Sequence, residues 1–274
     1  MLAEDLIKQG KVDEALAALE AEVRKNPADS KLRVFLFQIL CIKGDWERAL
    51  NQLAVAGEMD PMAMLMVQTC QSAISCERLR EQVFAGGKSP LIFGEPADWI
   101  AKMVQAAGMD ARGDSAAAAK LREGAFEAAP TTGGVIEVGP EDDKVEKHEF
   151  EWIADSDSRL GPMIEAIVDG KYYWIPFERI RLIRIEKPVD LRDAVWTPCQ
   201  FVWTTGAQGV GFIPTRYPGT QAKGNSDALR LARATEFDAD GTPRGHRVWT
   251  TDAGEYNLLQ VRAIRLNASI VEGS

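Results

Sequence analysis

The chain has 274 residues, of which 46% are hydrophobic and 27% charged, a composition typical of a globular protein long enough for two domains. Its formal net charge of −9 makes nucleic acid and anionic membranes unexpected partners. No apolar run approaches the roughly 20 residues that a membrane-spanning helix needs, and the N-terminus has no signal-peptide pattern. We therefore expect a cytoplasmic protein without membrane insertion.

The N-terminal part carries a spaced pattern of small and helix-breaking residues that indicates a structural repeat. Between these positions the apolar residues follow helical i, i+3, i+4 spacing, so each unit is predicted to contain two helices. A glycine favours the sharp turn after the first helix, an alanine allows close helix approach, and a proline ends the second helix. The period resembles that of the tetratricopeptide repeat, an ordinary pair of helical hairpins being the alternative. The recurring positions, offset by 34 residues, are Gly10, Ala15 and Pro27, then Gly44, Ala49 and Pro61.

A third unit is predicted after an interruption. One period further on, Arg78 occupies the position of the turn glycine. The signature reappears later with the same internal spacing, as Gly113, Ala118 and Pro130. We therefore predict a tetratricopeptide-like helical solenoid over residues 1–130, with an insertion around residues 78–97 that displaces the third hairpin.

The predicted solenoid has a candidate partner-binding surface. Solenoids of paired helices commonly bind partners on the concave side, which the first helix of each pair lines. In this register Val34, Gln38 and Cys41 of the second unit and Ile100 and Met103 of the displaced unit face that side. Their mostly apolar, uncharged character suits an amphipathic helix. The alternative is that they pack against the insertion or the C-terminal domain.

In the second half of the chain the spacing of the hydrophobic residues no longer follows a helical period. Residues 131–149 contain glycines, a proline and an acidic cluster, so we expect an acidic linker there. From residue 150 onward, short segments rich in β-branched and aromatic residues predict strands, and Asp169-Gly170 between two of them predicts a tight hairpin turn. We therefore predict a multidomain α+β protein whose β-rich domain covers residues 150–274. A small barrel is one form that this domain could take.

The segment DSDSRLGP, residues 155–162, is the most suggestive polar motif. Asp155 and Asp157 alternate like the first ligands of a calcium loop, and two carboxylates can also act as acid and base. Arg159 would place a positive charge at the next ligand position, and aspartates in tight turns commonly cap their own backbone. We therefore predict a structural turn without metal or cofactor in a non-catalytic binding scaffold. A small hydrolase or ligand-binding enzyme that uses Asp155, Asp157 and Arg159 is the alternative.

Several blocks of the second half resemble the ImpE/TagJ family of type VI secretion accessory proteins. The longest is FEWIADSDSRLGPMIEAIVDGKYYWIPFERI, and others are DLRDAVW, RYPGT, DALRLARATEF and TDAGEY. The resemblance implies a cytoplasmic adaptor without enzymatic activity or cofactor. It implies two partners, the N-terminal helix of the small sheath subunit and the AAA+ ATPase that disassembles contracted sheath. The family-motif residues, which we expect to maintain the fold, are Asp155, Asp157, Arg159, Gly161, Tyr172, Tyr173, Trp174 and Arg179.

Overall fold

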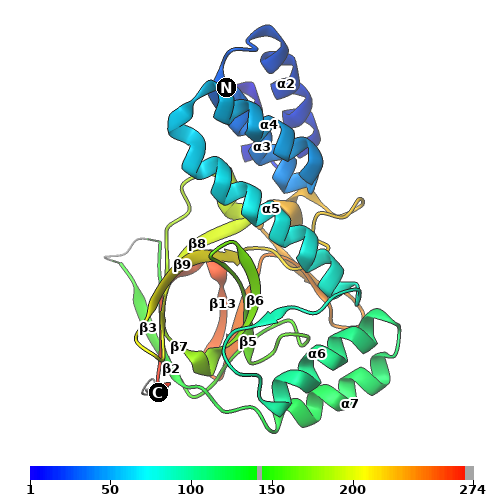
Figure 1. Cartoon of the computed structure of the whole chain (residues 1–274), viewed down its shortest axis with the longest axis vertical. Coiled ribbons are helices and arrows are strands. Elements are labelled where there is room, and N and C mark those ends of the chain that lie inside the picture. Colours follow the sequence, from blue (N-terminus) through cyan, green and yellow to red (C-terminus); the bar gives the residue numbers. More distant parts are fainter. Residues whose placement is uncertain (141–143, 269–274) are drawn as a thin grey trace.

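The computed structural model describes residues 1–140 and 144–268 of the chain. Helices α1 to α4 form an array at one end of the molecule, and a strongly curved sheet occupies the other end (Figure 1). The long helix α5, Met64–Phe84, runs from the array to the sheet and joins the two parts. A further helical hairpin, α6 and α7, lies beside the sheet at the end far from the array.

The array consists of two helical hairpins, which confirms the two-helix units. Gly10 (φ 74°) and Gly44 (φ 71°) adopt left-handed turns after α1 and α3, a conformation that glycine tolerates without strain. Ala15 and Ala49 are completely buried, so the paired helices can approach closely. The helices are α1 (Leu2–Lys8), α2 (Val12–Lys25), α3 (Ser30–Lys43) and α4 (Trp46–Met59).

The predicted insertion around residues 78–97 begins later than the repeat register indicates. Arg78 lies inside α5, because nothing between the short turn η1 (Pro61–Ala63) and Phe84 breaks a helix. The following loop carries strand β1 (Leu91–Ile92), which pairs with β6. The displaced hairpin then consists of α6 (Asp98–Ala111) and α7 (Ser115–Phe126), with Gly113 (φ 88°) at its turn.

The second part is built on a nine-stranded sheet with the strand order β1-β6-β5-β9-β8-β7-β14-β2-β3. A three-stranded sheet, β13-β12-β4, and the pair β10-β11 complete it. Asp169 and Gly170 form the turn between β5 and β6, as predicted. The strands are β2 (Gly134–Val138), β3 (Glu146–Phe150), β4 (Ile153–Asp155), β5 (Met163–Val168), β6 (Lys171–Pro176), β7 (Ile180–Ile185), β8 (Trp196–Trp203), β9 (Gln208–Pro214), β10 (Thr235–Phe237), β11 (Pro243–Gly245), β12 (Val248–Thr251), β13 (Gly254–Asn257) and β14 (Val261–Leu266). The short helices are η2 (Phe177–Arg179), η3 (Leu191–Ala194), α8 (Asp227–Arg230) and η4 (Leu258–Gln260).

The segment expected to be an acidic linker, residues 131–149, instead contributes strands β2 and β3 to the sheet on either side of residues 141–143, which lie outside the described residues. Strand β2 pairs with β14, and β3 pairs with β2. Ile136 of β2 is fully buried and lies opposite Ile264 of β14. The β-rich part therefore begins at Gly134 and not at residue 150. Glycines and acidic residues around this short strand hide its alternation, and its partner β14 lies at the far end of the chain.

Two hydrophobic clusters hold the molecule together. One is formed by buried residues of the sheets. The other runs through the helices and continues onto the sheet at Met163, Trp174 and Trp196. The helical array and the sheet therefore share a core. No helix in the described part of the chain is long and apolar enough to cross a membrane.

Candidate partner-docking site

A buried ionic network lies where α5 packs on the sheet. It contains four carboxylates and four guanidinium groups; three of the guanidinium groups pair with carboxylates, and that of Arg216 donates to backbone carbonyls. All members are buried except Arg159, which lies at the rim. The network consists of Glu77, Arg80, Asp155, Asp157, Arg159, Glu165, Arg216 and Arg247.

Glu165 of β5 is the centre of the network. Arg80 of α5 donates to both of its carboxylate oxygens, at 2.6 Å from Nε and 2.8 Å from Nη2. Arg247 and the hydroxyl of Tyr172 also donate to it. Burial raises the pKa of Glu165, but the positive charges of Arg80 and Arg247 outweigh burial and lower that pKa to about 2. Glu165 therefore stays ionised and ties α5 to the sheet.

Asp155, at the end of β4, has a different electrostatic environment. Its side chain pairs with Arg247 and accepts the backbone N–H of Asp157 at 2.9 Å. Burial raises the pKa of Asp155 to about 7, and Arg247 opposes this only in part. The neighbouring Asp157 raises it further. Asp155 and Glu165 share Arg247, and their pKa values lie far apart.

The DSDSRLGP segment forms a tight turn whose polar groups bond one another. Asp157 Oδ1 accepts the backbone N–H of Arg159 at 3.0 Å, and Asp157 Oδ2 accepts Arg159 Nη2 at 2.6 Å. Gly161 has φ 51°, and a Cβ there would clash with the ring of Phe126. This arrangement favours the structural interpretation over the hydrolase alternative. Among the described residues, no group of three or more His, Cys, Asp and Glu side chains could hold a metal ion.

The other family-motif residues also make structural contacts. The indole N–H of Trp174 donates to the hydroxyl oxygen of Tyr172 at 2.7 Å, which extends the network to a buried aromatic residue. Tyr173 contacts Phe93 edge to face, with ring centroids 5.9 Å apart. Arg179 donates to the carbonyl of Glu95 at 3.4 Å. These contacts anchor the loop between α5 and α6 on β6 and η2.

Glu165, Arg80 and Arg247 are network members that the sequence analysis did not single out, although Glu165 lies inside the longest family block. Glu165 is the one charged residue in the strand MIEAIV, all of which is buried. Arg80 lies on the buried stripe of α5, and Arg247 precedes β12. A charge inside an apolar strand or stripe signals a buried partner, because an unpaired buried charge is very costly. That signal identifies Glu165 but does not tell which arginine it meets.

The concave groove predicted from the repeat register does not form as expected. Cys41, Ile100 and Met103 are completely buried, in the core that the helices share with the sheet. Helices α3 and α6 lie toward opposite ends of the molecule (Figure 1), so their residues share no groove. Arg216 of the β-rich part donates to the carbonyl of Cys41 at 3.3 Å. The chain's own C-terminal domain therefore covers this end of the concave side, which was the alternative.

Val34 and Gln38 do line one hollow, which we call the N-terminal groove. Its volume is about 300 Å³, and it lies between α1, α3 and the turn η1. Met62 of η1, next to the groove residues Asp60 and Ala63, is 92% exposed. The lining residues are Glu4, Ser30, Lys31, Val34, Phe35, Gln38, Ala56, Asp60 and Ala63.

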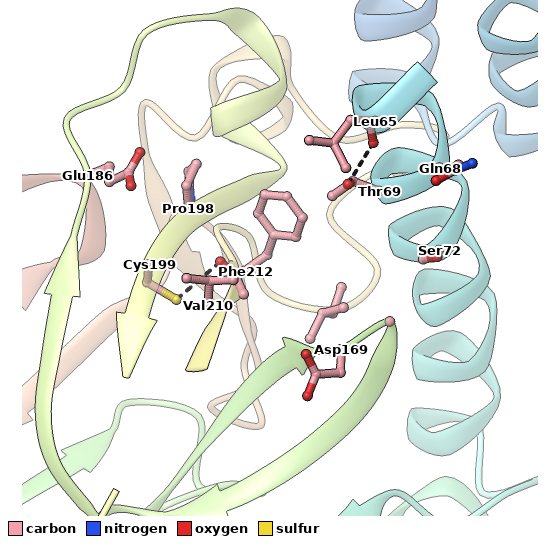
Figure 2. Close-up of a pocket in the computed structure, with 13 residues that line it drawn as sticks. Leu65, Gln68, Thr69, Ser72, Asp169, Glu186, Pro198, Cys199, Val210 and Phe212 are labelled. Carbon is pink, nitrogen blue, oxygen red and sulfur yellow. Dashed lines mark hydrogen bonds between the residues drawn. The ribbon is translucent and has the colours of Figure 1, made fainter. Parts of the chain in front are cut away.

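A second hollow, the interdomain groove, lies between α5 and the sheet and has a volume of about 450 Å³. Figure 2 shows α5 as one wall, strands β8 and β9 as the other, and Asp169 of the β5–β6 turn below them. Leu65 and Val210 on the two walls are largely exposed. The lining residues are Leu65, Gln68, Thr69, Ser72, Ile167, Asp169, Gly170, Glu186, Pro198, Cys199, Val210, Gly211 and Phe212.

Comparisons with known proteins agree with this architecture. Residues 6–69 match the family model described as Tetratricopeptide repeat, and residues 147–265 match the model described as ImpE protein. A crystal structure of a protein from Vibrio parahaemolyticus has the same fold, with a TM-score of 0.84 over 98% of this chain and 99% of that chain, at 22% identity. The molecule is thus a tetratricopeptide-like array joined to an ImpE-type β-rich domain.

A curated relative extends the match to nearly the whole chain. The chain is 47% identical over 264 residues to the type VI secretion system accessory component TagJ of Pseudomonas aeruginosa. The alignment covers 96% of this chain and 90% of that protein. The chain belongs to the ImpE/TagJ family.

Proposed function

We propose that this protein is a non-catalytic adaptor of the type VI secretion machine and acts in the cytoplasm. The observation that carries the proposal is the 47% identity, over 96% of the chain, to a protein named as an accessory component of that system. Arrays of paired helices commonly present binding surfaces for other proteins, which supports an adaptor role. The ion pairs of Asp155, Asp157 and Arg159 support the same role over hydrolysis.

The adaptor binds the N-terminal helix of the small sheath subunit in the N-terminal groove. Val34 and Phe35 offer apolar contacts there, and Gln38 offers a polar side chain without charge. Helix-in-groove recognition relies on such apolar anchors surrounded by a polar rim, here formed by Glu4 and Lys31. We propose the AAA+ ATPase that disassembles contracted sheath as the second partner.

Binding of the sheath-subunit helix as a labelled peptide tests this proposal. We expect Val34→Glu to weaken binding by about tenfold or more, because a carboxylate at a buried apolar contact of the interface must be desolvated. Val189→Glu is the matched control, since Val189 is 89% exposed and lies in neither groove. A peptide that fails to bind the wild type would contradict the partner, and equal binding to folded Val34→Glu would contradict the groove.

A further inference from the structure

We propose that the interdomain groove is a second docking site, and that its occupant is a basic amphipathic helix of another protein. This inference goes beyond the proposed function because no residue lines both grooves. It rests on three properties of the interdomain groove: a largely exposed helix face, apolar residues on both walls, and lining charges of a single sign.

The α5 wall is a helix face that, within the described part of the chain, stays largely exposed at Leu65, Gln68 and Thr69 and meets the β5–β6 turn at Ser72. Leu65, Gln68, Thr69 and Ser72 follow i, i+3, i+4, i+7 spacing and therefore lie on one side of the helix. None of them is charged, and Leu65 is 77% exposed. The opposite side of α5 packs in the shared core through Val67, Cys70 and other buried residues. A second helix can pack along the uncharged face by inserting its side chains between these residues.

The sheet wall offers apolar surface to the same occupant. Val210 of β9 is 69% exposed, and Phe212 lies next to it on the groove floor (Figure 2). Single exposed apolar residues are common on protein surfaces, whereas exposed apolar residues that gather in a groove are typical of an interaction site. An apolar face of the occupant thus contacts Leu65 on one side and Val210 with Phe212 on the other.

The size of the groove fits a helix that inserts about one turn. One turn of an α-helix is about 5.4 Å long and about 10–12 Å across with side chains, which corresponds to on the order of 500 Å³. The groove volume of about 450 Å³ is close to this value. The occupant therefore makes its apolar contacts through residues at i, i+3 and i+4, and its remaining turns lie on the surface.

The charge of the groove selects a basic occupant. Asp169 and Glu186 are the two charged residues among those that line it, and both are acidic. Arg184 lines an adjoining hollow that shares Asp169 and Val210 with this groove, but it does not line the groove itself. Lysine or arginine residues beside the apolar face of the occupant complement these carboxylates, which speeds association and excludes acidic helices.

Fluorescence anisotropy with the full chain and designed peptides tests the inference. The probe is a synthetic helical peptide of about 18 residues, or about five turns, with leucines on one face and lysines beside them. A matched peptide has glutamates in place of the lysines, and a third has a proline at its centre. We expect the lysine peptide to bind about tenfold or more tightly than the glutamate peptide at low salt. We expect the proline peptide to bind no more than weakly.

Variants then locate the site. We expect Val210→Glu and Leu65→Glu each to weaken binding of the lysine peptide by about tenfold, and Asp169→Asn with Glu186→Gln to reduce its preference over the glutamate peptide. Val189→Glu and Val34→Glu should bind it like the wild type. Equal binding of the lysine and glutamate peptides would overturn the inference, as would undiminished binding to folded Val210→Glu or Leu65→Glu. Undiminished binding of the proline peptide would instead indicate an extended occupant and would also overturn it.

Discussion

The guanidinium of Arg247 pairs with two carboxylates whose pKa values are shifted in opposite directions. One terminal nitrogen pairs with Asp155 and the other with Glu165, while Nε donates to the carbonyl of Pro214 at 2.9 Å. Glu165 has Arg80 as a second partner and a pKa of about 2. Asp155 has Arg247 as its ion-pair partner and lies beside the carboxylate of Asp157, and the pKa of Asp155 is about 7. Burial therefore dominates at Asp155, and charge pairing dominates at Glu165.

We predict that Asp155 makes the folded protein less stable as the pH rises. An ordinary paired carboxylate, whose pKa is lowered by folding, has the opposite effect. An unfolded aspartate has a pKa of about 3.9, whereas folded Asp155 has a pKa of about 7. Between these values the folded state keeps a proton that the unfolded state releases, so stability falls as the pH rises from about 4 to about 7. An asparagine side chain at this position carries no titrating proton. Asp155→Asn should therefore gain stability relative to the wild type over this window, by at most about 1.4 kcal/mol per pH unit.

Urea unfolding of both proteins at pH values of about 4.5 and about 7.5, near the two ends of this window, measures the difference. His246, whose pKa burial lowers to about 4, titrates in both proteins and largely cancels in the comparison. If the variant instead lost stability relative to the wild type at the higher pH, the pairing with Arg247 would dominate at Asp155.

Arg247 itself should be among the most costly residues to replace. Arg247→Met leaves Asp155 buried without its arginine, and breaking a buried pair in this way typically costs about 3–5 kcal/mol. Arg244→Met is the matched control, because Arg244 pairs with Asp238 at 2.7 Å where both side chains are at least one third exposed. That change should cost about 0–1 kcal/mol. Chemical denaturation compares the two variants, and equal losses would contradict a structural role for the network.

One segment of the β-rich part caps three helices of the array. This segment, residues 216–233, contains the family blocks RYPGT and DALRLAR. Arg216 donates to the carbonyl of Ile42 at 2.8 Å near the end of α3, and Arg233 donates to the carbonyl of Ile7 at 2.9 Å near the end of α1. Asp227 accepts the backbone N–H of Val12, at the start of α2, at 2.8 Å. Positive groups thus meet helix C-termini and a carboxylate meets a helix N-terminus, as the helix dipole favours.

The cap on α2 can be tested at the level of this element. Lys11, at the N-cap position, makes no side-chain cap, so Asp227 supplies the missing acceptor. Asp227→Ala should destabilise the protein by about 0.5–2 kcal/mol, and amide hydrogen exchange in the first turn of α2 should accelerate. Asp227→Asn keeps a side-chain oxygen and should retain most of the protection. If both variants exchanged as slowly as the wild type, the cap would contribute nothing to α2.

Elements whose signals are local were accessible from the sequence, and those that depend on distant partners were not. Gly10 and Gly44 mark turns that need a positive φ, and the strand pattern around Asp169-Gly170 is complete within a few residues. Strand β2 has no such local signal, because Ile136 is buried opposite Ile264 of the distant strand β14. The same limit applies to Asp227, which caps a helix more than two hundred residues earlier in the chain.

The prediction of partner-binding surfaces from the sequence fails for a related reason. Helical periodicity correctly assigns Cys41, Ile100 and Met103 to apolar faces, but it does not state what covers a face. Here the covering group is the chain's own β-rich part, which reaches Cys41 through Arg216. The interdomain groove was equally inaccessible, because Leu65 and Val210 come from elements that only the tertiary fold brings together.

The shared core makes the whole molecule one energetic unit. Trp196 of β8 lies against Trp46 of α4, with ring centroids 6.0 Å apart, and its indole N–H donates to Glu77 of α5 at 3.0 Å. Arg80 adds a buried ion pair between α5 and β5. These contacts are buried, so separating the array from the sheet would expose apolar surface and unpaired charges together. The shared core also connects the elements that line the two grooves.

The last prediction is that the full chain unfolds in a single cooperative transition, although it contains a helical array and a β-rich part. Far-ultraviolet circular dichroism follows mainly the helices, and near-ultraviolet circular dichroism follows mainly the tryptophans, five of which lie in the second half of the chain. Both signals should show the same urea midpoint, which is the test for two-state behaviour. Arg216→Met, which removes hydrogen bonds from the sheet side to α3, should lower both midpoints together. Two separate midpoints, or a shift in the helical signal alone, would show that the array folds independently of the sheet.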